Sequence, residues 1–463
     1  MNSKSFRNLS LKPALLENLD SLQFTEMTPV QAQSLPVALA GADLIAQAKT
    51  GSGKTAAFGL GLLQKLDADR FRIQSLVLCP TRELADQVAK DLRRLARTIH
   101  NIKILTLCGG MPFGPQIGSL EHGAHVIVGT PGRVEEHVRK GSLKLNDVNL
   151  LVLDEADRML DMGFQETLDA ILAEVPKQRQ TLLFSATYPA EIQQMAERVM
   201  SNPTMIRIEE QHDNHSIEQI FYEVSDHQDR LQMLRLTLAK FRPTATLVFC
   251  NTKRETDEVA DWLTEQGYSA LPLHGDMEQR QRDLTLVRFA NKSASILVAT
   301  DVAARGLDIT DLDAVINFHI SKDPEVHTHR VGRTGRAGSK GLAISFYTER
   351  EAHKIARLPL NIDPIADPVP RPADSFLDEP LLVPAMVTLQ IDGGKKQKVR
   401  PGDILGALTG GPDPLVATEV GKISIFDQSA YFAVSRSVAK RALKKIEQGK
   451  LKGRSFRVRL VRG

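Results

Sequence analysis

The sequence predicts an α/β protein: two tandem domains with doubly wound parallel sheets, followed by a small α+β domain. Three observations support this prediction. Short, wholly apolar runs alternate with amphipathic stretches through residues 1–350, as in parallel sheets that helices cover on both faces. The alternation lapses over the polar residues 209–219 and then resumes. After a second break, residues 384–463 follow a different order of strands and helices.

The first domain is placed at residues 1–208. Its predicted strands are continuous apolar runs such as "SLVLCP", "HVIVGTP", "LLVLDE" and "TLLFSA". Apolar runs of this kind, bounded by Gly or Pro, are typical of strands buried on both faces. Amphipathic stretches such as 82–97 lie between them and predict the crossover helices of βαβ units.

The second domain is placed at residues 219–363, where "ATLVFCN", "ILVATD", "AVINF" and "LAISF" repeat the same alternation. Six prolines fall between residues 364 and 384, among acidic residues, and predict a semi-rigid linker at 364–383. The third domain then occupies residues 384–463.

The composition is that of an ordinary globular protein, with 42% hydrophobic and 25% charged residues. The sequence shows neither a signal peptide nor an apolar run long enough to span a membrane, so a soluble, cytoplasmic protein is expected. Cys79, Cys108 and Cys250 lie far apart in apolar runs, without metal-ligand spacing. Buried, reduced thiols are therefore expected.

The segment "AKTGSGKT" (48–55) fits the Walker A phosphate-binding pattern, with alanine in place of its first glycine. It follows the apolar "DLIAQ" and precedes a helical stretch, the context that the motif requires. Gly51 and Gly53 let the backbone approach phosphates, Lys54 is expected to reach the β- and γ-phosphates, and Thr55 to bind Mg²⁺. The alternative is a chance glycine-rich turn. The residues predicted here to bind ATP are Ala48, Lys49, Thr50, Gly51, Ser52, Gly53, Lys54 and Thr55.

The run "NLLVLDEADRML" predicts a buried strand with Asp154 and Glu155 at its carboxyl end, where α/β sheets place ligands. Asp154 suits the Walker B role of holding Mg²⁺, and Glu155 can orient and deprotonate an attacking water. Acids that merely cap the next helix are the alternative. The phosphate loop earlier in the chain favours the nucleotide site.

Residues 154–157 read D-E-A-D, and the chain resembles the DEAD-box RNA helicases, which consist of two RecA-like domains. The resemblance covers roughly residues 1–350. Thr28-Pro29-Val30-Gln31 resembles the Q motif of the family, with Phe6 at the usual upstream distance. The resemblance implies that Gln31 reads the adenine edge and that Phe6 stacks on the base.

Further motifs follow in the order of the family. Residues 80–84 resemble motif Ia, 109–110 the GG element and 130–133 motif Ib, which in the family line the RNA backbone track. Residues 185–187 resemble motif III, which couples the ATP state to domain closure. The implied RNA contacts on this domain are Pro80, Thr81, Arg82, Gly110, Thr130, Gly132 and Arg133. The implied coupling residues are Asp157, Ser185, Thr187 and, from motif VI in the second domain, His329.

In the second domain, residues 247–253 resemble motif IV and 299–308 resemble motif V. The resemblance implies binding by Gln279, Arg282 and Thr300 to RNA and by Asp308 to the nucleotide. "HRVGRTGR" (329–336) resembles motif VI, whose arginines would reach the γ-phosphate as arginine fingers. A solvated basic loop is the alternative. The predicted catalytic residues are Lys54, Asp154, Glu155, Arg333 and Arg336.

The third domain is strongly basic although the chain as a whole carries only +3. Residues 384–463 contain 16 Lys or Arg and 6 Asp or Glu, a net charge of +10, which leaves about −7 for the rest. Such asymmetry predicts a nucleic-acid partner. Strands in "MVTLQID", "GKISIFD", "AYFAVS" and "RSFRVRLV", with helices in "RPGDILGALT" and "SVAKRALKKIEQ", give the order β-α-β-β-α-β. That is the order of an RNA-recognition-motif fold.

The period-two alternation assigns the faces of this predicted sheet. Side chains expected to face the helices are Phe432, Val434, Phe456, Val458 and Leu460. Those expected on a free outer face are Tyr431, Ala433, Ser435, Arg457 and Arg459. Base stacking on the sheet is doubtful, because Ala433 stands where a second aromatic is expected. RNA contacts are predicted instead for Lys395, Lys396, Arg441, Lys444, Lys445, Lys452, Arg454, Arg457 and Arg459. A solvated basic face, a protein-docking module and, for the loop at 392–403, an ordinary turn are the alternatives.

The segments "IDGGKKQKVRPGDILGALTG" and "LDEADRMLDMGF" resemble the DEAD-box protein A (DbpA) subfamily. That resemblance implies binding to a hairpin of large-subunit ribosomal RNA and a role in assembling the large subunit within pre-ribosomal particles. We therefore expect a monomeric, RNA-stimulated ATPase and helicase that uses ATP and Mg²⁺. The alternatives are an ATP-gated RNA clamp, a general RNA chaperone without a ribosomal target, and a DNA-directed motor.

Overall fold

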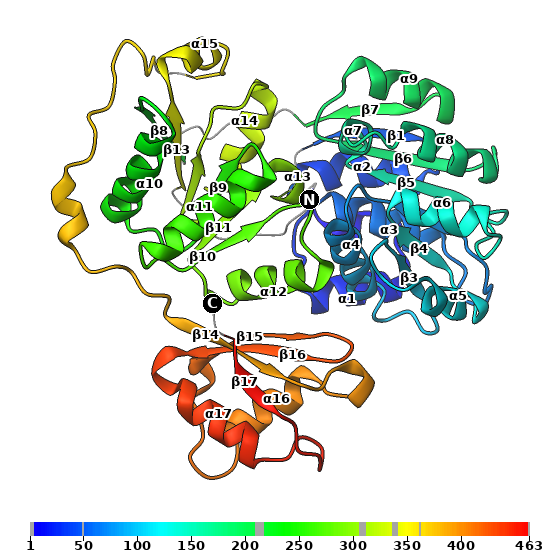
Figure 1. Cartoon of the computed structure of the whole chain (residues 1–463). Coiled ribbons are helices and arrows are strands. Elements are labelled where there is room, and N and C mark those ends of the chain that lie inside the picture. Colours follow the sequence, from blue (N-terminus) through cyan, green and yellow to red (C-terminus); the bar gives the residue numbers. More distant parts are fainter. Residues whose placement is uncertain are drawn as a thin grey trace. The chain divides into compact units, whose positions relative to one another are not determined.

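The computed structural model (Figure 1) describes residues 4–48, 51–208, 217–304, 312–335, 341–360 and 363–461. The described residues divide into two compact units, the first within 4–208 and the second within 217–461. The first unit is an α/β domain with a parallel sheet. The second unit contains another such domain and a small α+β domain. The predicted fold class is confirmed.

In the described part of the first unit, a seven-stranded parallel sheet has the order β3-β4-β2-β5-β6-β1-β7. The strands are β1 (Leu44–Gln47), β2 (Ser75–Leu78), β3 (Ile104–Leu107), β4 (Val126–Gly129), β5 (Leu150–Asp154), β6 (Gln180–Ser185) and β7 (Thr204–Arg207). Alternate residues of β5 enter different cores, with Leu150 and Val152 in one and Leu151 and Leu153 in the other. Burial on both faces explains why the run is continuously apolar.

The helices of the first unit cover the two faces of this sheet. They are α1 (Pro13–Ser21), α2 (Pro29–Leu39), α3 (Lys54–Lys65), α4 (Arg82–Leu95), α5 (Phe113–Glu121), α6 (Pro131–Arg139), α7 (Ala156–Asp161), α8 (Gln165–Glu174) and α9 (Ala190–Val199). Buried side chains of α1 to α4 belong to one core, and those of α6 to α9 belong to the other.

The described part of the second unit contains a six-stranded parallel sheet with the order β10-β11-β9-β12-β13-β8. The strands are β8 (Ile217–Glu223), β9 (Thr246–Cys250), β10 (Ala270–Leu273), β11 (Ile296–Thr300), β12 (Ala314–Asn317) and β13 (Gly341–Tyr347). The helices are α10 (His227–Phe241), α11 (Lys253–Glu265), α12 (Gln279–Ala290), α13 (Asp301–Ala304), α14 (Pro324–Val331) and α15 (Ala352–Ile355).

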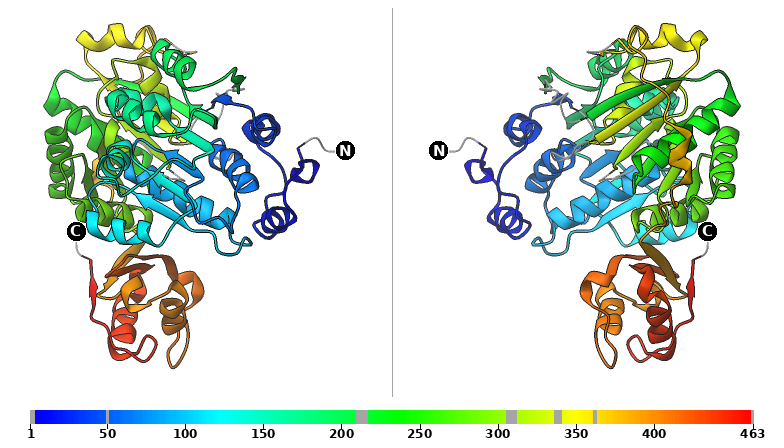
Figure 2. Two further views of the ribbon diagram at one scale, coloured as in Figure 1. Left: turned by 90° about the vertical axis from the view of Figure 1, so that its right-hand side faces the viewer. Right: turned by 90° about the vertical axis from the view of Figure 1, so that its left-hand side faces the viewer.

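The basic domain has the predicted order β-α-β-β-α-β. Its elements are β14 (Met386–Ile391), α16 (Pro401–Thr409), β15 (Val420–Ile425), β16 (Ala430–Ser435), α17 (Ala439–Gln448) and β17 (Val458–Leu460), with an antiparallel sheet ordered β15-β16-β14-β17. Both helices pack on one face of the sheet (Figures 1 and 2). Leu460, predicted to face the helices, is 41% exposed, because β17 is an edge strand and ends at this residue.

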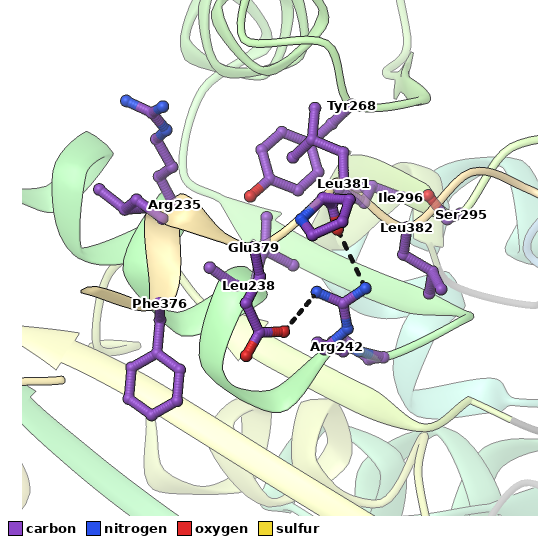
Figure 3. A pocket seen from close by; sticks show the side chains of 14 residues that line it. Arg235, Leu238, Arg242, Tyr268, Ser295, Ile296, Phe376, Glu379, Leu381 and Leu382 are labelled. Atoms are coloured by element: carbon purple, nitrogen blue, oxygen red, sulfur yellow. Dashed lines mark hydrogen bonds and ion pairs between the residues drawn. The ribbon is translucent and has the colours of Figure 1, made fainter. Parts of the chain in front are cut away.

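The proline-rich segment packs along α10. We call residues 371–382 the strap. Arg371 forms an ion pair with Asp229 at 2.6 Å, and Arg242 forms one with Glu379 at 3.0 Å. Arg242 and Glu379 line a groove, in which Leu381 also lies beside Leu238 and Tyr268 (Figure 3). The strap is therefore docked on the second helicase-like domain and does not hang free.

The three cysteines are buried free thiols, as predicted. Burial raises the pKa of each thiol, and for Cys79 the nearby carboxylate of Asp154 adds to the effect. Within the ranges that the structure describes, no helix is both long enough and apolar enough to cross a membrane.

Candidate functional site

The order of the first sheet brings the nucleotide motifs together. Strands β5, β6 and β1 are neighbours, so the segments that follow them meet at one edge of the sheet. The Walker A loop follows β1, the D-E-A-D turn follows β5 and motif III follows β6. The backbone N–H of Ala48 donates to the Ser185 carbonyl at 2.9 Å, which joins the first and last of these segments directly.

The Walker A loop has the backbone that a phosphate cradle needs. Gly51 and Gly53 have φ angles of 85° and 96°, in the left-handed region that favours glycine. A Cβ at Gly53 would lie 2.5 Å from the amide nitrogen of Gln31, so a side chain does not fit there. Lys54 begins α3 and donates from Nζ to the Ala48 carbonyl at 2.8 Å. Lys49 and Thr50 lie outside the described residues.

Gln31 joins the Q motif to this loop. Its Nε2 donates to the Gly53 carbonyl at 3.1 Å, and its Oε1 accepts from the Thr28 N–H at 2.9 Å. Its amide is thus bound to the protein itself. Phe6 is only 3% exposed and packs edge-on against Phe24, with the ring centres 6.2 Å apart. The structure does not present the open ring face that the predicted stacking on adenine needs.

Asp154 ends β5 and is 3% exposed. Burial raises its pKa to about 7, although Lys54 acts in the opposite direction. Its Oδ1 has no hydrogen-bond partner among the described residues, which is unusual for a buried polar atom. An unpartnered carboxylate oxygen beside a phosphate loop fits a Mg²⁺ ligand.

Two other acids shape the D-E-A-D turn. Glu155 adopts a left-handed backbone, with φ of 53°, and is 5% exposed. Such strain in a residue other than glycine is often found at functional sites. Asp157 Oδ2 accepts from the N–H and the hydroxyl of Thr187 at 3.0 and 2.9 Å, and its N–H donates to Ser185 Oγ at 3.4 Å. These bonds tie the turn to motif III.

The predicted RNA motifs follow the neighbouring strands β2, β3 and β4 at the same edge of the sheet. Thr81 caps α4, and Thr130 precedes α6. Arg82 lies directly against Gly110, where a Cβ would be 1.8 Å from its Nη1. Pro80 is buried and Gly132 is exposed.

Arg133 is bound to its own protein. Its side chain is 11% exposed, and Nη1 donates to the Met111 carbonyl at 2.9 Å and to Gln116 Oε1 at 2.8 Å. Nε pairs with Glu136 at 3.1 Å. These contacts hold the Arg133 guanidinium against its own protein, and its contact with RNA stays a prediction.

In the second unit, the described site residues lie at the end of β11, on α12, and in or just after α14. Thr300 ends β11, and its hydroxyl accepts from the Ala303 N–H at 3.4 Å. Gln279 donates to Asp283 at 2.9 Å, and Arg282 donates to the His274 carbonyl at 3.2 Å. His329 lies in α14 and Arg333 just after it, where Arg333 is half-buried. Asp308 and Arg336 lie outside the described residues.

Arg330 was not among the site residues predicted from the sequence. It is 2% exposed and makes two hydrogen bonds of 2.7 Å to the carboxylate of Asp301. It also donates to Asn317 Oδ1 at 3.2 Å and lies over the Phe249 ring. The available signal was an acid, Asp301, directly after a buried strand, together with a further arginine in "HRVGR".

The outer face of the basic domain is only partly free: the prediction is wrong for Tyr431 and Ala433, which are buried, while Arg457 and Arg459 are exposed as predicted. Thr388 and Ala433 are each 1% exposed and Tyr431 is 6% exposed. The Thr388 hydroxyl is 3.1 Å from Asn291 Nδ2 and 2.7 Å from Ser293 Oγ, two residues of the preceding domain. This contact, which sequence alternation cannot reveal, covers the central strand β14 at Thr388.

The predicted RNA-binding cations of this domain fall into two groups. Arg441, Lys452 and Lys395 pair with Glu419, Asp403 and Asp427 at 3.1, 3.2 and 3.8 Å, Lys445 donates to the Pro412 carbonyl at 2.7 Å, and Arg459 donates to Gln390 at 3.1 Å. The other cations are exposed and form no ion pair with any described residue: Lys396, Lys444, Arg454 and Arg457.

Three family models match the chain. They are the DEAD/DEAH box helicase (residues 28–195), the helicase conserved C-terminal domain (226–338) and the DbpA RNA binding domain (388–460). Among solved structures, Dbp5 of S. cerevisiae bound to RNA and ADP BeF3 is similar, with a TM-score of 0.69 and 31% identity. The match covers 76% of this chain and 92% of that one.

Two curated relatives agree with these matches. The ATP-dependent RNA helicase DbpA of Escherichia coli (strain K12) is 54% identical over 452 residues, 98% of each chain. The DEAD-box ATP-dependent RNA helicase CshA of Bacillus subtilis (strain 168) is 43% identical over 347 residues, 75% of this chain and 70% of that protein. The chain therefore belongs to the DEAD-box ATP-dependent RNA helicases, in the branch that carries a DbpA RNA-binding domain.

Proposed function

We propose that this helicase is directed by its C-terminal domain to a hairpin of large-subunit ribosomal RNA and acts, as a monomer, in assembly of the large ribosomal subunit within pre-ribosomal particles. The observation that carries the proposal is the match of residues 388–460 to the DbpA RNA binding domain, with exposed cations on that domain. The net charge of +10 on that domain supports contacts with RNA phosphates. Lysine and arginine side chains release the counterions bound to the phosphates, and this release provides affinity that does not depend on sequence.

The chemistry of hydrolysis is assigned to residues at the edge of the first sheet. Asp154 and Thr55 would hold Mg²⁺, which when bound to ATP neutralises charge on the β- and γ-phosphates. Lys54 moves from the Ala48 carbonyl to those phosphates, and Glu155 orients and deprotonates the water. Arg333 and Arg336 of motif VI donate to the γ-phosphate in the transition state. Gly51, Ser52 and Gly53 supply backbone N–H groups.

The link between ATP and RNA is assigned to the turn that holds Asp157. Its bonds to Thr187 and Ser185 let a change at the phosphates reach motif III. Arg82, Thr81 and Gly110 form the RNA path on the first domain. Contacts to phosphate and 2′-hydroxyl groups, made by short loops with few aromatics, favour a core that does not read bases.

The test compares ATPase activity of the full chain in titrations with a large-subunit ribosomal RNA fragment and with unrelated RNA of equal length. A variant replaces the four exposed cations by alanine: Lys396, Lys444, Arg454 and Arg457. The control variant is Lys144→Ala with Lys177→Ala, since these exposed lysines precede β5 and β6 at the opposite edge of the sheet. Truncation is avoided because the strap packs on α10.

The ribosomal fragment is expected to reach half-maximal stimulation of the ATPase at a concentration at least about tenfold lower than the unrelated RNA does. This difference should disappear when the four cations are replaced. Equal action of both RNAs on the full chain would favour a general RNA chaperone. Tight, ATP-dependent RNA retention with slow product release and little unwinding would favour an RNA clamp.

A further inference from the structure

Residues 108–112 connect β3 to α5 and contain Gly109 and Gly110 of the predicted RNA path. Side chains from α5 and α6 hold this loop in place. Gln116 of α5 is 9% exposed, and its Nε2 donates to the Cys108 carbonyl at 3.1 Å. Its Oε1 lies 2.9 Å from His137 Nε2. An amide oxygen only accepts hydrogen bonds, so His137 carries a proton on Nε2 in this arrangement.

The same network fixes the far end of the loop. Arg133 bonds to both Gln116 Oε1 and the Met111 carbonyl, so one guanidinium group joins α6, α5 and the loop. The His137 ring stacks on Phe113, with centres 4.1 Å apart and planes at 16°. Helix α6, which begins in motif Ib, is thereby tied to the loop at several points.

The loop in turn sets the position of Arg82. Gly110 has φ of 73°, and the Arg82 guanidinium occupies the space where a Cβ would be. The two groups proposed to face RNA, the glycine backbone and Arg82, are therefore in direct contact. A displacement of the loop by about an ångström would change the distance between these two groups. A misplacement of that size is enough to weaken an interaction that depends on their geometry.

We propose that Gln116 and His137 are positioning residues for RNA binding, which hold residues 108–112 against Arg82 and so preset the phosphate-binding face. This inference rests on the proposed RNA path through Arg82 and Gly110. A face that is already ordered before binding lowers the conformational entropy that is lost when RNA binds. Loosening it weakens RNA binding and leaves hydrolysis unchanged once RNA is saturating, because the nucleotide motifs follow other strands.

The test measures ATPase activity against the concentration of a single-stranded RNA of unrelated sequence, with ATP saturating. Gln116→Leu is expected to raise the half-saturating RNA concentration about tenfold and to leave kcat at saturating RNA within about twofold. His137→Leu should act in the same way. His137→Gln, which keeps a donor near the position of Nε2, should restore much of the RNA affinity.

Gln74→Leu is the matched control. Gln74 is also buried and holds a loop, through bonds of 2.7 and 2.8 Å to the Asp67 and Arg70 carbonyls, but it precedes β2 at the opposite edge of the sheet. An equal shift in Gln74→Leu would overturn the inference, because general destabilisation would explain both. Arg82→Ala separates the two proposals. If it leaves RNA half-saturation unchanged, the RNA path fails; if it weakens binding and Gln116→Leu does not, only the positioning role fails.

Discussion

Glu155 is buried at the strained turn after β5, and its carboxylate is proposed to take a proton from the attacking water. Glu155→Gln keeps the shape of the side chain but removes the base. ATP affinity should stay within about threefold, while hydrolysis at saturating RNA should fall at least about 100-fold. Nucleotide-binding titration and ATPase assays measure the two effects. Asp161→Asn, in the helix that follows, is the control and should remain active.

His327 of α14 provides a pH-dependent prediction. It is 2% exposed, both ring nitrogens lack a hydrogen-bond partner in the described part of the chain, and the ring stacks on Phe221. Burial, helped by Arg330, lowers its pKa to about 4. Since an unfolded histidine titrates near pH 6.5, the unfolded state binds a proton first as pH falls. Stability from the neutral ring is thus fully present above about pH 6.5 and declines toward pH 4.

His327→Phe removes this titration and keeps the stacked ring. Between pH 7 and pH 5 the wild type should lose about 2 kcal/mol more unfolding free energy than the variant. Denaturant unfolding at both pH values measures the difference, and carboxylates that titrate in this range cancel between the two proteins. Equal losses in both proteins would show that His327 does not govern the acid sensitivity.

Some residue roles could not be read from the sequence. The glycines, Lys54 and Asp154 were predicted because their spacing and their place at strand ends carry the chemistry. The intramolecular partners of Arg133 and Arg330 were not predicted, because the sequence does not reveal which carbonyl or carboxylate meets each guanidinium. Whether a long cationic side chain is exposed or bound within the protein depends on partners that are distant in sequence.

At the scale of elements, the ion pair between Asp301 and Arg330 joins the segment after β11 to α14. Breaking a buried pair leaves an uncompensated charge, whereas replacing both partners is far milder. Asp301→Leu should therefore lower the unfolding free energy of this domain by about 3 kcal/mol or more. The double variant Asp301→Leu/Arg330→Met should recover most of that loss. Thermal unfolding of both variants tests this; equal destabilisation would mean that Arg330 acts mainly through its other contacts.

The sequence predicted elements best where apolar runs are buried on both faces. The runs that became β5, β6, β9 and β11 are apolar apart from polar residues at their ends, and the structure buries them completely. The last strand was predicted from residue 454 but begins at Val458. The reason is a local turn, in which Leu451 and Arg454 pair with each other. Alternation alone cannot distinguish a short edge strand from the turn before it.

At the scale of the whole molecule, the C-terminal domain is attached to the second helicase domain at two places. The strap follows α10, and Thr388 bonds to Asn291 and Ser293. The stiffness that the composition suggests for the proline-rich segment stays a prediction, and the composition could not show the groove that receives it. Docking limits the volume that the basic domain explores, and so raises the effective concentration of the core at a bound RNA.

Loosening the strap should therefore weaken delivery of RNA to the core. Arg242→Asn with Leu381→Ser removes one ion pair, the hydrogen bond from Arg242 to the Pro380 carbonyl and one apolar contact. Asn tolerates the left-handed backbone of Arg242. Proteolysis between residues 364 and 383 should accelerate about fivefold, since cleavage follows the population of the undocked segment. The ribosomal RNA concentration for half-maximal ATPase should rise several-fold, by about threefold or more.

The control variant is Arg357→Asn with Ile365→Ser, which changes exposed residues that precede the strap. It should match the wild type in both assays. Faster proteolysis with an unchanged ATPase titration would mean that the strap is docked but does not help to deliver RNA. Unchanged proteolysis would contradict the prediction and mean that other contacts, such as the Arg371–Asp229 ion pair, keep the strap docked without Arg242 and Leu381.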